Sequence, residues 1–182
     1  LCPDQPVIAA LVDNQLKGLD FTILEQHNIR FVTYDHPDGR RTYIRSLCFV
    51  LQNAVNELFP DKVLAIDYSL PSGLYCEIRH KDRLEDGRYD IYPVTDAELA
   101  LLKEKMQELI ARDLPFKRVK MTLDEASKLY SAKHQTEKVH LLHSLKHFTY
   151  SVYFLDGKAD TFYGPLAPST RYITTFDIMG FN

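Results

Sequence analysis

The stretch from Arg40 to Pro60 has the strongest periodic pattern in the chain and constrains its fold most. Apolar residues recur there at spacings of three, four and seven, at Ile44, Leu47, Cys48, Leu51, Val55 and Leu58. Such spacing predicts a helix of about five turns with one apolar stripe. Asp38-Gly39 indicates a turn before it, Thr42 an N-cap and Pro60 its end. The opposite face is then expected to carry Arg45, Phe49, Gln52 and Asn56.

Size and composition describe an ordinary globular protein. The 182 residues are 45% hydrophobic and 26% charged, which is enough for a substantial core. A formal net charge of -3 gives no overall attraction to nucleic acid or membrane, although a local basic cluster can still bind phosphate. No apolar run approaches ~20 residues and the N-terminus lacks a signal pattern. Three widely separated cysteines favour reduced thiols, so we expect a cytoplasmic protein.

The remaining patterns predict alternating short strands and helices. Strands are expected at 7–12, 21–24, 29–34, 63–69, 74–79, 116–121, 148–155, 159–163 and 173–178. Helices are expected after the capping box 95–98, from 122, and over 137–145. Residues 35–41 read as a linker, and the charged residues 80–92 read as an exposed loop. The prediction is an α+β fold with a largely antiparallel sheet and helices on one face.

Residues typical of catalysis are present but poorly spaced for it. His140, His143 and His147 include an i, i+4 pair that could bind zinc, but no carboxylate or cysteine accompanies them, so a solvated face is favoured. The sequence has no nucleophile elbow, P-loop or GxGxxG motif. We therefore predict no metal site.

Two groups of residues could instead contact a nucleic acid. Arg40, Arg41 and Arg45 gather with His36 near the start of the long helix, where amides and arginines suit phosphate. Phe162 and Tyr163 could stack a base. Surface arginines and aromatic core residues are the commoner outcome for such patterns, and the charge balance favours that interpretation of the arginines.

Three stretches together resemble the second additional domain of threonyl-tRNA synthetase, which hydrolyses mischarged tRNA in that family. They are the helix ending NELFP at Pro60, the segment LAIDYSLPSGLYCEI with the helix LLKEKMQELIARDLPFKRV, and DTFYGPLAPST from Asp160. The strands of residues 7–34 resemble the later part of a TGS domain, a ubiquitin-like module. The resemblance implies two domains, a partial TGS-like module at 1–36 and an editing-domain-like region at 37–182.

The differences from this family concern its catalytic residues. The family uses HxxxH on the long helix and CxxxH in the stretch around Gly-Pro. Aligned through Leu58-Phe59-Pro60 and through Gly164-Pro165, these four positions fall on Arg45, Phe49, Phe162 and Leu166. Such side chains supply neither a metal site nor a general base. The resemblance therefore implies a kept scaffold with a degenerate editing site.

A closer resemblance covers DGRRTYIRSLCFVLQNAVNELFP, YGPLAPST and FDIMGF. These segments look like the N-terminal region of the Bacteroides-type uridine (nucleoside) kinases, which precedes a P-loop kinase domain. The resemblance implies that ATP and Mg²⁺ serve only that absent C-terminal kinase domain, which would be this chain's partner. No cofactor is expected in the chain itself.

Our main hypothesis is a non-catalytic region of a uridine kinase-like protein, serving binding, regulation or domain organisation. The first alternative is a module that binds tRNA, RNA or a nucleotide through Arg40, Arg41, Arg45, Phe49, Phe162 and Tyr163. The second is a freestanding editing hydrolase that uses His36 or the three histidines near residue 143. The sequence leaves the ligand and the oligomeric state open.

Overall fold

The structure is a computed structural model that describes residues 5–71, 73–85, 87–132, 136–145 and 148–180. The chain forms two compact units. The first unit contains Leu1–Thr42 and Pro115–Pro168, and the second contains Tyr43–Leu114 and Ser169–Asn182. The α+β prediction is confirmed, because small antiparallel sheets and helices make up the described residues. No helix in these residues is long and apolar enough to cross a membrane.

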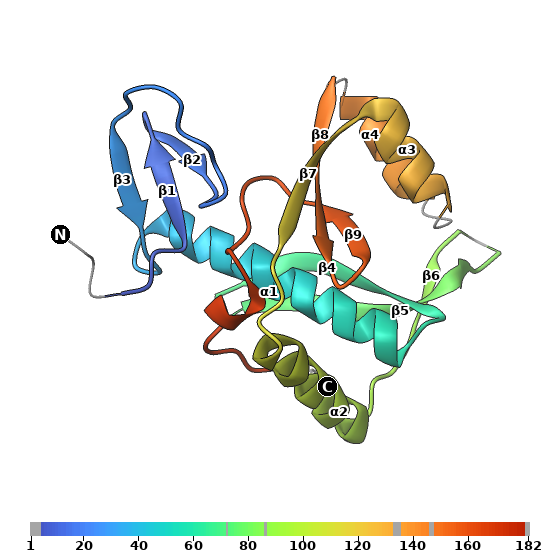
Figure 1. The fold of residues 1–182 in the computed structure, drawn as a ribbon. Coiled ribbons are helices and arrows are strands. Elements are labelled where there is room, and N and C mark those ends of the chain that lie inside the picture. The colour runs from blue at the N-terminus through green and yellow to red at the C-terminus, as the bar shows by residue number, and fades with distance from the viewer. Residues whose placement is uncertain (1–4, 72, 86, 133–135, 146–147, 181–182) are drawn as a thin grey trace. The chain divides into compact units, whose positions relative to one another are not determined.

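Two three-stranded antiparallel sheets lie in the first unit (Figure 1). One has the order β2-β1-β3, formed by β1 (Ala9–Val12), β2 (Gln15–Lys17) and β3 (Ile29–Val32). The other has the order β7-β8-β9, formed by β7 (Lys117–Thr122), β8 (Thr149–Leu155) and β9 (Lys158–Thr161). Helices α3 (Leu123–Ala132) and α4 (Thr136–Leu145) follow β7 in the chain.

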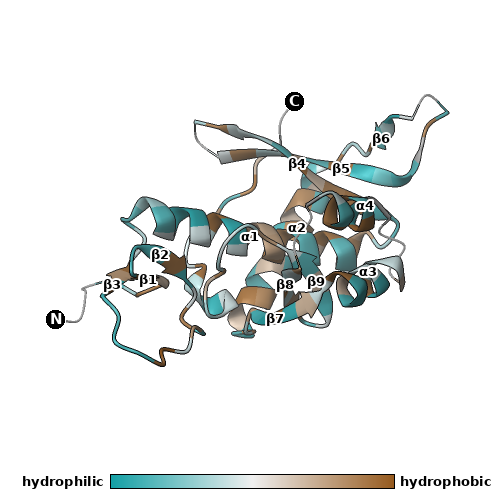
Figure 2. Ribbon diagram, turned by 90° about the horizontal axis from the view of Figure 1, so that it is seen from above, coloured by the Kyte–Doolittle hydropathy of each residue, from teal (hydrophilic) through white to brown (hydrophobic). Residues whose placement is uncertain are grey.

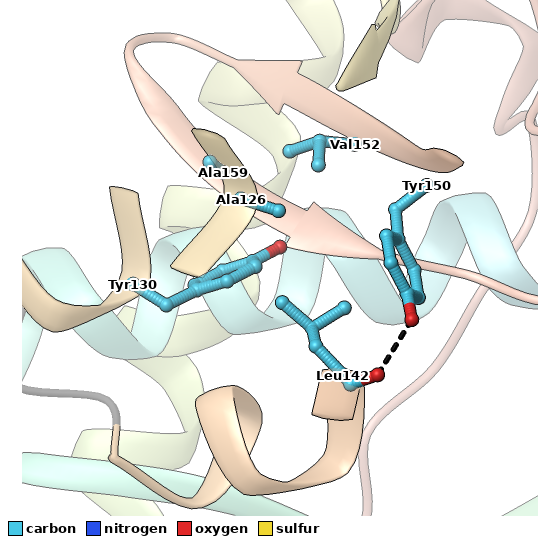
Figure 3. Packing of buried hydrophobic residues seen from close by; sticks show 6 residues of the cluster. All are labelled: Ala126, Tyr130, Leu142, Tyr150, Val152 and Ala159. Atoms are coloured by element: carbon cyan, nitrogen blue, oxygen red, sulfur yellow. Dashed lines mark hydrogen bonds between the residues drawn. The ribbon is translucent and has the colours of Figure 1, made fainter. Parts of the chain in front are cut away.

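The core of the first unit lies between the β7-β8-β9 sheet and the two helices that follow β7 (Figure 3). Its buried members are Ala126, Tyr130, Leu142, Tyr150, Val152 and Ala159. The Tyr150 hydroxyl donates a hydrogen bond to the Leu142 carbonyl at 2.5 Å, which ties β8 to α4. The turn between β8 and β9 uses positive φ at Asp156 (48°) and Gly157 (77°), as the Asp-Gly pair predicts.

The second unit contains the β4-β5-β6 antiparallel sheet with the longest hairpin. Its strands are β4 (Lys62–Leu70), β5 (Gly73–Arg83) and β6 (Tyr89–Ile91). Helix α2 (Asp96–Ala111) opens with the predicted capping box of Thr95 and Glu98. A single 3₁₀ turn (Thr170–Tyr172) is attached to α2 because the buried Thr170 hydroxyl donates to the Leu109 carbonyl at 2.9 Å.

The long helix, α1 (Pro37–Leu58), begins earlier than predicted. Asp38-Gly39 lies in its first turn rather than in a preceding turn, and Thr42 is a buried helical residue rather than the N-cap. Proline suits the first helical position because its missing N–H has no partner there anyway. The imidazole of His36 accepts a hydrogen bond from the Asp38 amide at 3.2 Å, so His36 performs the capping.

The predicted apolar stripe is not the most deeply buried face of α1. Ile44 is 42% exposed, and Leu47, Cys48, Leu51 and Leu58 are only half-buried. Within the stripe only Val55 is fully buried, and the other fully buried positions lie mostly on the opposite side, at Thr42, Ser46, Phe49, Val50, Asn53 and Ala54. The helix is thus covered on more than one side, and hydrophilic and hydrophobic residues both occur along it (Figure 2). Periodicity alone assumes one buried side, which is why the prediction of the core face was wrong.

Three other predictions of local structure were wrong. Residues 21–24 form no strand, and the second strand is Gln15–Lys17, after the positive-φ turn at Asp13-Asn14. The segment 80–92 is not one loop, because β5 continues to Arg83 and β6 pairs with it. Residues 173–178 form no strand within the described part of the chain. Predictions of strands from apolar patterns fail in two ways here: exposed strands can be rich in charged residues, and loops can contain short apolar runs.

Candidate functional site

The loop that follows β9 presents an aromatic side chain to solvent in the first unit. We call residues 162–166 the aromatic loop. Tyr163 is 76% exposed, whereas Leu166 is 3% exposed. The Phe162 ring meets the Tyr153 ring edge-on, with centroids 6.2 Å apart. Gly164 has φ of 111°, a conformation that other residues rarely adopt. The loop therefore has a defined conformation in which Tyr163 is accessible.

Tyr153, on β8, contacts this loop through both its ring and its hydroxyl group. Its side chain is almost fully buried, and its hydroxyl donates to the Gly164 carbonyl at 3.4 Å. Burial raises the pKa of Tyr153, so the hydroxyl stays a donor at neutral pH. Arg118 lies opposite Tyr153 in the β7–β8 register, and its positive charge acts in the opposite direction on that pKa.

A partly buried ion pair lies just before the same loop. The ammonium of Lys138, on α4, lies 2.6 Å from the carboxylate of Asp160, on β9. The same carboxylate oxygen accepts a hydrogen bond from the Thr161 amide at 2.7 Å. The Lys138 ammonium also lies 5.5 Å from the ring centroid of Tyr130. Burial, and then the charge of Asp160, raise the pKa of Tyr130, so its hydroxyl is neutral.

Lys138 is a site residue that sequence reasoning missed, and Asp160 was noted only as part of a motif. No local pattern pairs them, because they are separated by 22 positions and meet only when α4 and β9 pack. Asp160 accepts from Lys138 and from the Thr161 amide through the same oxygen, Oδ1. These contacts fix the carboxylate at the end of β9, just before the aromatic loop. They give Asp160 a role in positioning that loop.

In the second unit, the buried face of α1 is unusually polar. Ser46 and Asn53 are fully buried beside Phe49, which is 1% exposed. The Asn53 amide donates to the Phe49 carbonyl at 2.9 Å. Its amide oxygen has no hydrogen-bond partner in the part of the chain that the structure describes. An unpaired buried acceptor costs about 1–3 kcal/mol, so this face is not optimised for stability.

The predicted site residues are distributed over both units. Arg45 and Phe49 belong to the second unit, and Phe162 and Leu166 belong to the first. Arg45 is half-buried and already has an interaction partner. One turn beyond Phe49 on the same buried face lies Asn53, whereas Arg45 lies one turn before it.

The two N-terminal arginines of α1 are exposed but already engaged. The Arg41 guanidinium lies 2.6 Å from the Asp38 carboxylate, and that of Arg40 donates to the Asp35 carbonyl at 3.2 Å. An acidic residue in the first turn also neutralises the positive end of the helix dipole. A phosphate would have to displace these contacts. The structure thus lends this cluster less support as an anion site than the sequence pattern did.

The candidate histidines that the structure describes lie at two separate places in the first unit. His140 and His143 are exposed on α4, and His147 lies outside the described residues. His36 caps α1 and lies 3.6 Å from the Asp38 carboxylate. No group of three or more His, Cys, Asp or Glu side chains suited to a metal ion occurs within the described ranges. Cys48 and Cys76 are free thiols there.

Comparison with known proteins identifies one class of relative. A threonine–tRNA ligase of Desulforamulus reducens is 28% identical over 174 residues, covering 94% of this chain and 26% of the ligase. Those of Azobacteroides pseudotrichonymphae and Lawsonia intracellularis are each 26% identical, covering 93% and 81% of this chain. The chain spans about a quarter of the length of these relatives. No protein-family model matches it.

These similarities confirm the predicted resemblance to threonyl-tRNA synthetase over nearly the whole chain. The fold is consistent with an editing-like domain. The relatives are ligases rather than kinases, so they give no support to the predicted uridine kinase parent.

Proposed function

We propose that this chain is a tRNA-binding module that retains the scaffold of a synthetase region without its hydrolytic centre. The similarity to threonine–tRNA ligases over 94% of the chain carries this proposal. The aromatic loop supplies a surface for it, since Tyr163 is exposed while the residues around it are packed. The alternative predicted from the sequence, a binding module, therefore becomes the main function.

Tyr163 is the residue through which an unpaired nucleotide would bind. A base stacked on an exposed aromatic ring contributes about 1–3 kcal/mol, whatever the base. Stacking needs a ring that does not move away, and the loop meets this need through Tyr153 and the Lys138–Asp160 pair. Phe162 is half-buried against Tyr153, so it supports the loop rather than offering a second open face.

The absence of hydrolysis follows from the side chains at the four degenerate positions. Arg45, Phe49, Phe162 and Leu166 carry no group that activates water at neutral pH. Phe49 and Leu166 are also buried. We therefore expect the chain to bind tRNA and to leave an aminoacyl ester intact.

The test is equilibrium binding of deacylated threonine tRNA to the whole chain and to Tyr163→Ala. The control is Phe148→Ala, which removes another exposed aromatic ring, 95% exposed, from the same unit. Loss of one stacked base predicts binding weaker by about fivefold to a hundredfold for Tyr163→Ala and unchanged for Phe148→Ala. No binding by the unaltered chain, or equal losses in the two variants, would overturn the proposal.

The same assay should include uridine and ATP with Mg²⁺. A uridine kinase parent, with a C-terminal kinase domain as partner, stays a prediction from the sequence. If the chain binds nucleosides or nucleotides but not tRNA, a regulatory role beside such a kinase replaces the tRNA-binding function.

A further inference from the structure

The geometry points to a phosphodiester-binding surface on strand β7, next to the aromatic loop. This inference rests on the proposed function and assigns it a second contact region. We call Arg118 and Lys120 the β7 basic strip. The strand contains no acidic residue within Lys117–Thr122. In a chain with a net charge of -3, this is a local excess of positive charge.

The strand geometry places Arg118 and Lys120 on the same face of the sheet. Successive strand residues point to opposite faces, and Met121 packs against the hydrophobic cluster beneath the helices. Arg118 and Lys120 therefore face away from that core, about 7 Å apart along the strand. Lys120 is exposed and lies opposite Ser151, a half-buried hydroxyl residue of β8.

The strip is continuous with the aromatic loop through Tyr153. Arg118 lies directly opposite Tyr153 in the β7–β8 register, and the Tyr153 ring contacts Phe162. Tyr163 follows Phe162 directly in the chain, so we infer that the phosphates of a nucleotide stacked on Tyr163 extend toward Arg118. Lys120, two residues farther along β7, would meet the next part of the backbone. Positive side chains in this position fit a polyanion and do not depend on base identity.

Arg118 already forms an ion pair with Asp20, a residue from the N-terminal part of the first unit. The Asp20 carboxylate lies 3.1 Å from the Arg118 guanidinium, and their side chains are 53% and 22% exposed. Because Asp20 is largely solvated, the pair is weak enough for a phosphate to replace the carboxylate. Asp20 is therefore an internal competitor that lowers affinity for RNA. Removing its charge should strengthen binding.

The strip ends where α3 begins. Thr122 and Glu125 form a capping box there, with the Glu125 carboxylate accepting from the Thr122 amide at 2.8 Å. This acidic first turn limits the positive surface to the part of β7 nearest the aromatic loop. Lysines on an edge strand such as β7 also discourage pairing with other sheets. If the lysines serve only to prevent such pairing, removing the charge of Asp20 should not change the affinity for a polyanion. Measuring that affinity therefore distinguishes the two roles.

The experiment measures binding of deacylated threonine tRNA and of inorganic polyphosphate at several salt concentrations. Lys120→Gln is compared with Lys128→Gln, which removes an exposed charge from α3 in the same unit. Loss of one phosphate contact should lower the slope of log affinity against log salt by about 0.7–0.9 for Lys120→Gln only. Asp20→Asn should bind both polyanions about two- to fivefold more tightly. Glu104→Gln, exposed on α2 in the second unit, is its control.

The outcomes separate this inference from the proposed function. If tRNA binding depends on Tyr163 but Lys120→Gln behaves like Lys128→Gln, the β7 basic strip is overturned and tRNA binding stands. The strip is also overturned if Asp20→Asn binds the polyanions no more tightly than Glu104→Gln does. If the chain binds polyphosphate but not tRNA, the proposed function is overturned, and the strip is supported if Lys120→Gln weakens that binding more than Lys128→Gln does. If the unaltered chain binds neither polyanion, both are overturned.

Discussion

Replacing Lys138 by methionine tests whether the ion pair with Asp160 holds the aromatic loop in place. The substitution keeps most of the aliphatic stem and removes the ammonium that lies 2.6 Å from the carboxylate. The Asp160 side chain is only 11% exposed, so its charge would lose its cation without gaining full hydration. It would keep the hydrogen bond from the Thr161 amide.

These contacts determine how much Lys138→Met should lower the free energy of unfolding. Removing one partner of a fully buried pair costs about 3–5 kcal/mol, and leaving a buried polar group unpaired costs about 1–3 kcal/mol. The Lys138 side chain is 27% exposed, so water can reach part of the vacated space. We therefore expect Lys138→Met to lower the free energy of unfolding by about 2 kcal/mol. The corresponding decrease in Tm is about 4–8 °C for a chain of this size.

Urea unfolding followed by far-UV circular dichroism measures this change, since the chain contains no tryptophan. Amide exchange at Thr161 gives a local readout, because its N–H donates to Asp160. Lys128→Met, on the exposed surface of α3, is the matched control. The double variant Lys138→Met/Asp160→Asn should recover part of the loss, because it removes the stranded charge. A loss below about 0.5 kcal/mol, as for an ordinary surface residue, would refute the positioning role.

Three further predictions concern other parts of the fold. Gly39→Ala should destabilise the chain by about 2 kcal/mol despite the better helix propensity of alanine, because the added Cβ would lie 1.9 Å from the Thr33 carbonyl oxygen. Gly73→Ala is the control, since its Cβ would meet nothing within 4 Å, and it should be nearly neutral in the same urea unfolding assay. Hydrogen bonds from Tyr92 and Thr95 lower the pKa of Glu98 in the folded state. The stabilisation from Glu98 is therefore complete above its ordinary pKa of 4.5 and is lost as the pH falls through the folded pKa. Glu98→Gln should reduce the loss of unfolding free energy at acid pH, and an unchanged dependence on pH would contradict this. Burial, with a smaller effect of Cys76, raises the pKa of the Cys48 thiol to about 12. Mass spectrometry should therefore find slow alkylation of Cys48 at pH 8 until urea unfolds the chain. Rapid alkylation of the folded chain would instead show an accessible thiolate.

Local sequence signals predicted those elements whose cause is local. The capping box at Thr95, the turn at Asp156-Gly157 and the hairpin of β4 and β5 all depend on residues within a few positions of one another. The helix from Pro37 was also predicted, because its apolar periodicity extends over most of its length. Its start was misplaced, since the imidazole of His36 serves as a cap that residue preferences do not suggest.

The buried face of α1 could not be predicted in the same way. Most of its periodic apolar residues are half-buried or exposed, with Val55 the exception, while Ser46 and Asn53 are fully buried. A hydrophobic pattern identifies the face that is most apolar, and this coincides with the buried face only when one side of the helix is covered. A buried polar residue depends on tertiary neighbours for its hydrogen bonds, so a single sequence does not mark it.

The candidate site shows the same division between local and tertiary causes, and this bears on function. The aromatic loop was found because Phe162-Tyr163 before Gly164-Pro165 is a local motif, but the contacts that hold it come from Tyr153, Lys138 and Asp160. An apolar pair of similar volume is often at least as stable as an ion pair with limited solvent access, so the Lys138–Asp160 pair is not needed for stability alone. The pair fixes the position of the loop, and the loop presents the exposed Tyr163, which is the arrangement that the proposed binding function requires. Binding has different requirements from catalysis: it needs a fixed surface and complementary charge, and both are present in the first unit.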